Sequence, residues 1–391
     1  MKMRNFLSSL LFPTALCFVA GGLSSCTDAP QLTLSGLDPT RFATDSTALY
    51  TLTTEDGRME VCFTNFGGRI VSIMVPDHEG NLQDVCLGFD NIDDYIATAP
   101  AGCNFGALIG RYGNRIGGSR FTLDGTEYAL VANDHGNSLH GGGDVAFHNR
   151  IWTARQIDAQ HLEMTTTSPD GEDGYPGTLD VKVIYSLTAD HGLQITYEAT
   201  TDKPTVVNLT NHCYFCLSGD PSKDALSTTL AIAADHYTPV DSVVAVTGEI
   251  AGVEGTPMDF TTPTPIGQRI DDTTFEQLVN GHGYDHNWVL RRSSLSFVDG
   301  DEAVRQPCAT LTDPTSGITM DIFTDQPGLQ FYAGNFLDGS FVGKRGIAYP
   351  RRSGLCFETQ HFPDSPNRPD FPSTVLRPGE TYHTTTVYKF R

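Results

Sequence analysis

Hydrophobic and polar residues alternate with a period of two over much of the chain. Between residues 179 and 187 the apolar side chains take alternate positions: Leu179, Val181, Val183, Tyr185 and Leu187. The segment 193–199 repeats the alternation after the turn-forming sequence TADHG. Because successive side chains of a strand point to opposite faces, this pattern is typical of antiparallel strands with one buried face. The two segments therefore predict a β-hairpin.

Similar short runs are spread along the rest of the chain and are separated by Gly, Asn, Asp and Pro. They cover residues 58–65, 69–75, 151–157, 161–167, 205–210, 317–323, 328–334 and 384–390. The best helical candidate is residues 273–281, where Thr273 and Glu276 could form a capping box and Gly281 would end the helix. The sequence shows neither internal repeats nor a strand–helix–strand rhythm. It predicts an all-β fold, a large antiparallel β-sandwich.

The N-terminus has the pattern of a secretory signal. Lys2 and Arg4 precede an apolar segment, residues 6–23, and small residues then lead to Cys26. The cysteine at this point resembles a bacterial lipobox, which predicts cleavage before Cys26 and acylation of its sulfur. A plain signal peptide and a retained membrane span are the alternatives, but the apolar segment is short for a span and contains Pro13.

These features divide the chain into three parts. Residues 1–25 are expected to be a signal peptide, residues 26–46 a lipidated cysteine with a flexible tether, and residues 47–391 a single folded domain. We therefore expect an exported bacterial lipoprotein, held at a membrane only through its lipid, on the periplasmic or cell-surface side. A monomer is the default expectation.

The composition narrows the classes of partner. The chain has 391 residues and a formal net charge of −22. Such an acidic protein is not expected to bind nucleic acid or polyanionic sugars, and a neutral substrate fits better. Seven cysteines follow Cys26, and their odd number and scattered positions predict buried thiols rather than a disulfide framework.

Several segments place polar groups where packing alone would not require them. GRYGNRIGG carries Asn114 and Arg115 among glycines, and NSLHGGG sets His140 beside three glycines that would let the backbone approach a ligand. His212 lies inside the strand-like run NLTNHCYFCL, where it could be a tuned acid. Taken singly, each of these has an ordinary explanation: a solvated turn, an exposed loop, or a core histidine with its hydrogen bonds satisfied.

Three further segments end or begin strands with polar groups. In GYDHNWVL, Asp285 precedes an apolar run and could orient and charge His286. In GLQFYAGN, Gln330 could fix a sugar hydroxyl while an aromatic residue at 331 or 332 packs on the sugar face. In FETQHFPDSPN, Glu358 lies at the end of an apolar strand just before a proline-rich loop.

Together these six motifs, in the same chain order, resemble the aldose 1-epimerase (galactose mutarotase) family from about Leu49 to the C-terminus. The resemblance implies the β-sandwich of that family and an acid–base reaction on a free aldose sugar. It implies that Glu358 is the general base and His212 the general acid. It also implies that His140 binds near the sugar ring oxygen and that the remaining substrate contacts come from Asn114, Arg115, Tyr214, Asp285 and Gln330.

The chemistry explains why these residue types are needed. Interconversion of anomers opens the pyranose ring, so a base must take the proton of the anomeric hydroxyl while an acid protonates the ring oxygen. The two groups must be in opposite protonation states, and nearby acids are expected to keep His212 charged. A carboxylate and an imidazolium suffice, so no cofactor is expected.

The sequence departs from the family pattern in two places. Tyr112 and Gly113 stand where many relatives have small residues, which could alter the edge of the pocket. The acidic segment 295–308 lies between two motif strands and could shape access to the cleft.

Other interpretations remain open at this level. Glu358 and Asp285 could be the carboxylate pair of a glycoside hydrolase, although His212 would then have no necessary role. A non-catalytic sugar-binding lipoprotein would not need both Glu358 and His212. The spacing of His140, His212, Glu358 and Asp285 matches no metal motif, so no catalytic metal is expected. A structural calcium ion held by SPDGEDG (168–174) or NIDDY (91–95) is a further hypothesis.

Overall fold

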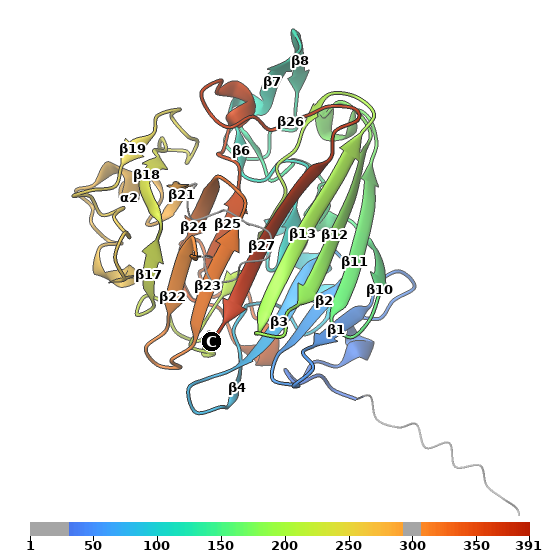
Figure 1. Ribbon diagram of the computed structural model, residues 1–391, viewed down its shortest axis with the longest axis vertical. Helices are drawn as coiled ribbons and strands as arrows, with labels where there is room; N and C mark the ends of the chain where they lie inside the picture. Colours follow the sequence, from blue (N-terminus) through green and yellow to red (C-terminus); the bar gives the residue numbers. More distant parts are fainter. Residues whose placement is uncertain (1–30, 292–305) are drawn as a thin grey trace, which may run out of the picture. The chain divides into compact units, whose positions relative to one another are not determined.

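The computed structural model describes residues 31–291 and 306–391. Within these residues the largest sheet has nine antiparallel strands, with β13, β27 and their neighbours side by side in Figure 1. In spatial order the strands are β10 (Thr153–Gln156), β11 (His161–Ser168), β12 (Leu179–Leu187), β13 (Gly192–Thr201), β27 (Tyr382–Phe390), β23 (Thr319–Thr324), β22 (Ala309–Thr312), β17 (Thr229–Ile232) and β20 (Thr264–Pro265).

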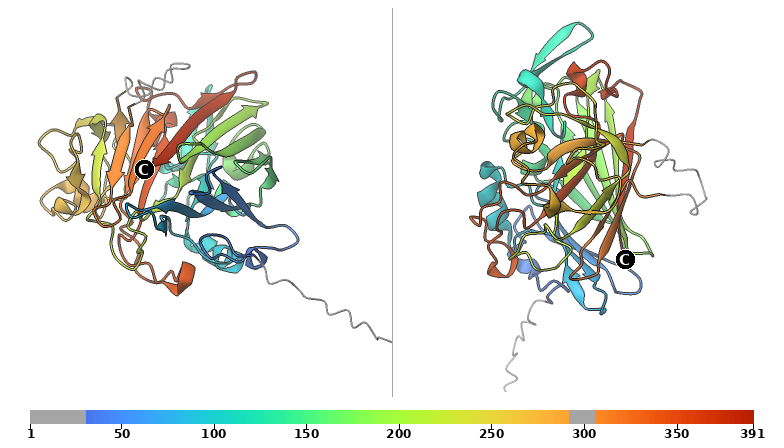
Figure 2. Two further views of the ribbon diagram at one scale, coloured as in Figure 1. Left: turned by 60° about the horizontal axis from the view of Figure 1, so that its bottom comes forward. Right: turned by 90° about the vertical axis from the view of Figure 1, so that its left-hand side faces the viewer.

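Two further sheets lie across the core from this one, as the two views in Figure 2 help to follow. One has six strands in the order β16 (Tyr214–Phe215), β25 (Leu355–Gln360), β24 (Gly328–Tyr332), β21 (Asp285–Leu290), β18 (Ala234–Thr238) and β19 (Ala251–Gly252). The other has four strands: β1 (Leu49–Thr53), β2 (Glu60–Thr64), β3 (Arg69–Pro76) and β4 (Leu82–Asp84).

The core between these layers follows from the alternation in the sequence. Strand β12 buries every second residue, and its inward side chains belong to one large apolar cluster that draws on all three sheets. Phe63 of β2 contacts Tyr185 of β12 with ring centroids 4.5 Å apart. Phe215 of β16 contacts Tyr388 of β27 at 4.9 Å. The predicted hairpin and the predicted antiparallel β-sandwich are therefore confirmed.

Short strand pairs, the two α-helices α1 (Ile92–Thr98) and α2 (Glu276–Asn280), and several 3₁₀ helices complete the described part. The pairs are β5 (Ala107–Ile109) with β15 (Thr210–His212), β6 (Arg115–Ile116) with β9 (Ser138–Leu139), β7 (Arg120–Leu123) with β8 (Thr126–Ala129), and β14 (Thr205–Val206) with β26 (Val375–Leu376). Helix α2 ends at Gly281 as predicted. The predicted capping box is wrong, because Phe275 is the N-cap residue and no side chain caps the helix.

Residues 31–46 are not the flexible tether that the sequence predicted. Leu37 and Phe42 are buried, and the backbone amide of Leu34 donates to the carboxylate of Glu60. The polar character of the segment concealed these two apolar anchors. The predicted signal peptide and Cys26 lie outside the described residues, as does most of the acidic segment 295–308.

The structure also answers the questions of disulfide bonds and of membrane-spanning helices in the described residues. The seven cysteines after Cys26 are all buried and unpaired, which confirms the prediction drawn from their number and spacing. Among the residues described, the helices are all too short and too polar to cross a bilayer.

Candidate active site

One face of the six-stranded sheet forms the floor of a cavity of about 230 Å³. In the sheet register Glu358 lies opposite Gln330, and Tyr332 lies opposite Asp285. Because side chains alternate between faces, these residues share one face, while Phe331 and Phe357 point into the core and stack on each other. The period-two pattern thus brings polar side chains of three motifs to one face of the sheet, among them the acids Asp285 and Glu358.

Glu358 and His212 meet at this cavity from different sheets. Glu358 lies on β25 and His212 ends β15, and both side chains are buried. Their Oε1 and Nε2 atoms are 3.7 Å apart. The second carboxylate oxygen of Glu358 and Nδ1 of His212 are buried without a hydrogen-bond partner in the described residues. Buried polar atoms are normally satisfied, so this pair is arranged for a group that the protein itself does not supply.

Burial shifts both groups away from their ordinary titration. Burial, and then the neighbouring Asp285, raise the pKa of Glu358 well above its ordinary value. Burial lowers the pKa of His212 to about 4. The expectation that nearby acids keep His212 charged is therefore wrong for the unliganded site, because the cost of burying the imidazolium is the larger effect. Between these two pKa values the pair holds one proton, on Glu358.

Two hydrogen bonds, each donated by a backbone amide, connect His140 and Asn114. The amide of Asn114 donates to Nδ1 of His140 at 3.2 Å, and the amide of His140 donates to the carbonyl of Asn114 at 3.1 Å. Both residues have left-handed backbones, with φ of 64° and 55°. Burial, followed by the neighbouring His212, lowers the pKa of His140, so the ring is neutral and its Nε2 carries the proton. His140 thereby presents a fixed hydrogen-bond donor to the cavity.

Arg115 is the one Lys or Arg among the described residues that line the cavity. Its Nε donates to Asp134 at 2.7 Å, so the guanidinium is anchored from the side. Its positive charge lowers the pKa of both Glu358 and Asp285, but burial has the larger effect and both pKa values remain raised. Asp134 was missed at the level of sequence, although it lies in the same loop as His140.

Asp285 lines the cavity and Gln330 supports it. The amide nitrogen of Gln330 donates to Oδ1 of Asp285 at 2.7 Å. Gln330 is not among the residues that line the cavity, and its bond fixes the Asp285 carboxylate. A direct contact of Gln330 with the substrate stays a prediction. Asp285 does not charge His286 either: consecutive strand residues point to opposite faces, and burial lowers the pKa of His286 to about 3.

Aromatic residues form the side wall. Tyr214 stacks on His212 with centroids 5.0 Å apart, and Tyr332 meets Tyr214 edge-on. Of the two aromatic residues next to Gln330, only Tyr332 reaches the cavity. The sequence analysis did not identify the other residues that line the cavity, and all of these except Leu139 of NSLHGGG lie outside the six motifs. They are Ala101, Gly102, Cys103, Asn104, Phe105, Leu139, Phe336, Leu337 and Phe341.

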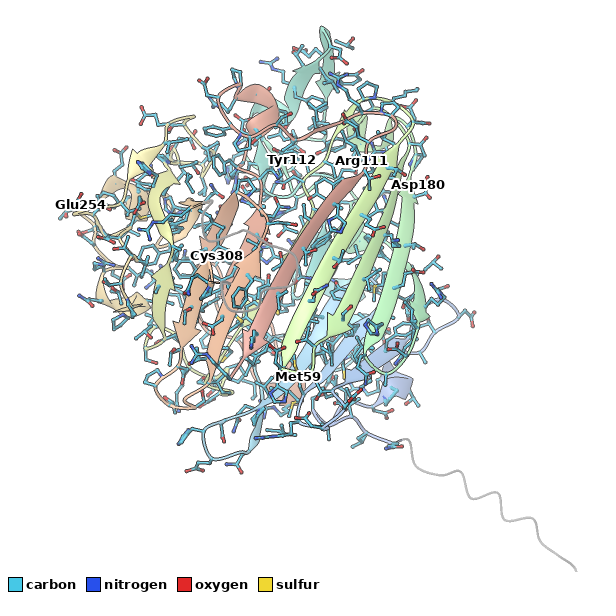
Figure 3. All side chains as sticks on the ribbon, viewed as in Figure 1. Met59, Arg111, Tyr112, Asp180, Glu254 and Cys308 are labelled. Carbon is cyan, nitrogen blue, oxygen red and sulfur yellow. The ribbon has the colours of Figure 1, made fainter. Side chains whose placement is uncertain are left out.

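The expectation that Tyr112 alters the edge of the pocket is wrong. It is fully buried in a separate apolar cluster, and its hydroxyl donates to the carbonyl of Phe362. The neighbouring Arg111 is also structural, because it donates to Ser168 and to the carbonyl of Pro176 (Figure 3). Both residues brace the loop framework that carries Asn114.

Metal binding finds little support in these contacts. Among the described residues, His140, His212 and Glu358 form one group with metal-ligand atoms within 4.8 Å of one another. The protonated Nε2 of His140 is a donor, which makes it a poor metal ligand. In the two acidic segments, Glu172 pairs with Arg150, and Asp94 lies in the first turn of α1 (Ile92–Thr98) next to its N-cap Asn91. These carboxylates have partners, which argues against a calcium loop.

Comparisons with known proteins agree with the motifs. A family model described as aldose 1-epimerase matches residues 49–389. Galactose mutarotase of Mus musculus is 43% identical over 333 residues, which cover 85% of this chain and 91% of that protein. Aldose 1-epimerase of Escherichia coli (strain K12) is 36% identical over 335 residues, covering 85% of this chain and 92% of that protein. A crystal structure of a GalM/aldose epimerase homologue from C. elegans matches with a TM-score of 0.78, at 28% identity, over 88% of this chain and 99% of that chain.

Proposed function

The chain belongs to the aldose 1-epimerase family and is an isomerase, and we propose that it interconverts the α and β anomers of free aldohexoses such as galactose and glucose. One observation carries the assignment of roles: Glu358 and His212 face each other across 3.7 Å in a cavity of monosaccharide scale. An acid and a base at this spacing can reach the anomeric hydroxyl and the adjacent ring oxygen of one pyranose.

Ring opening uses the pair in its charged form. The Glu358 carboxylate takes the proton of the anomeric hydroxyl, the bond between C1 and the ring oxygen breaks, and the released oxygen takes a proton from His212. The product is the open-chain aldehyde, with Glu358 now protonated and His212 neutral. The C1–C2 bond then rotates, and closure from the other face returns both protons.

The resting protonation of the site matches the open-chain stage of this cycle. Burial favours protonated Glu358 and neutral His212, which is the state that exists when the aldehyde is bound. Burial therefore favours the protonation state of the open-chain stage over that of the closed-sugar stage. The closed sugar must instead favour the charged pair. Its anomeric hydroxyl donates to the Glu358 carboxylate, and its ring oxygen accepts from the His212 imidazolium.

The other cavity residues bind and orient the sugar in this scheme. His140 donates from Nε2 near the ring oxygen, and Asn114 fixes the ring of His140. Asp285 accepts from sugar hydroxyls, while Tyr214 and Tyr332 cover apolar C–H surface of the sugar. Asp134 already pairs with Arg115, the one Lys or Arg among the described residues of the cavity wall, so neutral aldoses fit better than anionic sugar phosphates. Acid–base chemistry of this kind needs no cofactor.

The test is an anomer-resolved proton spectrum of freshly dissolved α-galactose and α-glucose. The protein should accelerate the approach to the anomeric equilibrium, and Glu358→Gln should lower kcat by about 10²–10⁴-fold, the usual worth of one acid or base. The variant should keep the wild-type fold, because glutamine has nearly the same shape. Near-normal turnover in Glu358→Gln would remove the assignment of the base.

The same preparation separates the rival functions. A glycoside hydrolase would release reducing sugar from aryl glycosides, whereas an epimerase leaves them intact because they lack a free anomeric hydroxyl. A purely sugar-binding protein would bind galactose with unchanged anomer kinetics.

We also propose that the protein is an exported monomeric lipoprotein, attached to a membrane through acylated Cys26. The supporting evidence is the order of charged, apolar and small residues at the N-terminus, which resembles a lipobox. Gel filtration of the protein without residues 1–26 should give a mass near that of one chain.

A further inference from the structure

One wall of the cavity is a tight turn directly before β5. Cys103, Asn104 and Phe105 line the cavity, and the amide of Ala107 donates to the carbonyl of Asn104 at 3.0 Å. Gly106 completes the turn with φ of 68°, and an added Cβ there would lie 1.9 Å from the carbonyl oxygen of Ile70. The turn is therefore pressed against β3 and can hold only glycine at its rear.

A buried cation fixes this wall from behind. The guanidinium of Arg69 is fully buried and donates to the carbonyls of Cys103 and Phe105, both at 3.1 Å. These carbonyls flank Asn104 on either side. Burying a charge is costly unless it is well hydrogen-bonded. The buried guanidinium of Arg69 therefore fixes the backbone of residues 103–105. The carbonyls on both sides of Asn104 accept from Arg69, and Asn104 itself lines the cavity.

The side-chain oxygen of Asn104 has no hydrogen-bond partner among the described residues. Only 8% of the residue is exposed, and this Oδ1 atom is buried. An unsatisfied buried acceptor destabilises the fold, and a well-packed wall does not keep one without a reason. A hydroxyl of a bound sugar would supply the missing donor.

We propose that Asn104 is a specificity-determining residue that accepts a hydrogen bond from one hydroxyl of the bound aldose, and that Arg69 positions it. The inference rests on the proposed function, because it takes the sugar to occupy this cavity. It adds a contact that none of the six motifs contains.

The topology indicates which part of the sugar is nearest. Strand β5 pairs with β15, and the amide of Gly106 donates to the carbonyl of His212 at 3.0 Å. Asn104 therefore lies on the His212 side of the cavity, which faces the ring oxygen. The neighbour of the ring oxygen other than C1 is C5, which carries the hydroxymethyl group. The 6-hydroxyl is accordingly the first candidate.

The experiment compares wild type with Asn104→Leu on galactose and on its 2-, 3-, 4- and 6-deoxy derivatives. Leucine has a similar shape and cannot accept a hydrogen bond. For galactose we expect KM to rise about three- to tenfold with kcat unchanged, the signature of one lost hydrogen bond made equally in ground and transition states. For the one deoxy sugar that lacks the contacted hydroxyl, wild type and variant should have the same KM.

A structural role predicts something different: the variant would weaken all five sugars by the same factor, and that result would overturn the proposal. Asn149→Leu is the matched control, because Asn149 also has a buried unpartnered Oδ1 but does not line the cavity. It should leave every KM unchanged. Asn104→Ala repeats the comparison with a smaller side chain if the leucine variant does not fold.

Calorimetric titration separates this inference from the proposed function. The same five sugars are titrated into Glu358→Gln and into the double variant with Asn104→Leu, where turnover plays no part. Loss of the affinity difference for one deoxy sugar supports the contact even if wild type proves inactive as an epimerase. An equal difference for all five sugars, or no binding of any, overturns it.

Discussion

At the scale of single residues, the ionised Glu358 that catalysis needs lowers the stability of the fold. Folding buries Glu358 and raises its pKa from an ordinary value of 4.5, so the folded state favours the protonated carboxyl. For a group whose folded pKa is raised, the stability is present below the unfolded pKa and is lost as pH rises through the folded pKa. Glutamine resembles the protonated form and does not titrate.

Glu358→Gln should therefore be more stable than wild type at pH 8 and nearly equal to it at pH 4. Scanning calorimetry at the two pH values measures the difference in Tm, with each kcal/mol corresponding to about 1–2 °C for a chain of this length. A Tm below that of wild type at pH 8 would show that the buried carboxylate stabilises the fold, in contradiction to its raised pKa.

The pH dependence of catalysis follows from the same pair. The value of kcat/KM reports the free enzyme, which is active when the pair holds one proton. A second proton binds with the low pKa of His212, about 4, and sets the acid limb. Loss of the single proton follows the raised pKa of Glu358 and sets the basic limb.

Asp285→Asn should move the basic limb to lower pH. Asp285 raises the pKa of Glu358 by charge repulsion, and an asparagine can still accept the hydrogen bond from Gln330. The measurement is kcat/KM between pH 5 and 10, after subtraction of the spontaneous reaction, which hydroxide accelerates. A drop in amplitude without any shift of the limb would mean that Asp285 only binds sugar.

The candidate site was predictable residue by residue where a motif marks it. Glu358, His212, His140, Arg115 and Asp285 all line the cavity, as expected from their segments. Asn104 could not be found in this way, because it depends on a turn fixed by Arg69 from another strand. The protonation state of His212 could not be predicted from the sequence either, because the effects of burial and of nearby charges on its pKa can be compared only when the fold is known.

At the scale of elements, a buried ion pair attaches the loop that brings Phe336 and Phe341 to the cavity. Lys344 follows Phe336 and Phe341 in this loop, and its Nζ donates to Asp84 at 2.6 Å and to the carbonyl of Val71 at 2.7 Å. Both charged side chains are largely buried. Removal of one partner leaves an uncompensated charge in the interior, which typically costs about 3–5 kcal/mol.

Lys344→Met should accordingly lower the free energy of unfolding by about that amount, measured by urea titration. The control is the double variant Lys344→Met with Asp84→Asn. It removes both charges and keeps the Asp84 oxygen that accepts from the Ile73 amide. Recovery of most of the loss in the double variant identifies the stranded charge as the cause, whereas an additive loss would assign it to packing.

The elements themselves were predicted unevenly. Strands β12 and β13 were clear because one of their faces is solvated, so polar residues mark every second position. Helix α1 was missed because its seven residues are too few for a period of 3.6 to show, and its two acids were interpreted as a calcium loop. The segment 31–46 was misjudged because Leu37 and Phe42 are isolated in it and their burial depends on distant strands.

At the scale of the whole molecule, the sandwich and its cavity belong to residues that begin at Gln31. The contacts that build the site lie between β3 and β25, far from Cys26 in sequence. A lipid on Cys26 would therefore set the location of the protein and leave the chemistry unchanged. The acidic chain adds no attraction to anionic lipid headgroups, so the acyl groups would carry the attachment.

Cys26→Ala tests this separation of location from catalysis. In cells that export and acylate lipoproteins, wild type should sediment with membranes and release only with detergent, whereas the variant should be soluble or remain an uncleaved precursor. Purified samples of both should have the same kcat/KM for galactose, because the cavity is built without Cys26. A variant that still fractionates with membranes after removal of residues 1–25 would refute lipid anchoring. A lower kcat/KM in the processed variant would instead show that the N-terminus reaches the site.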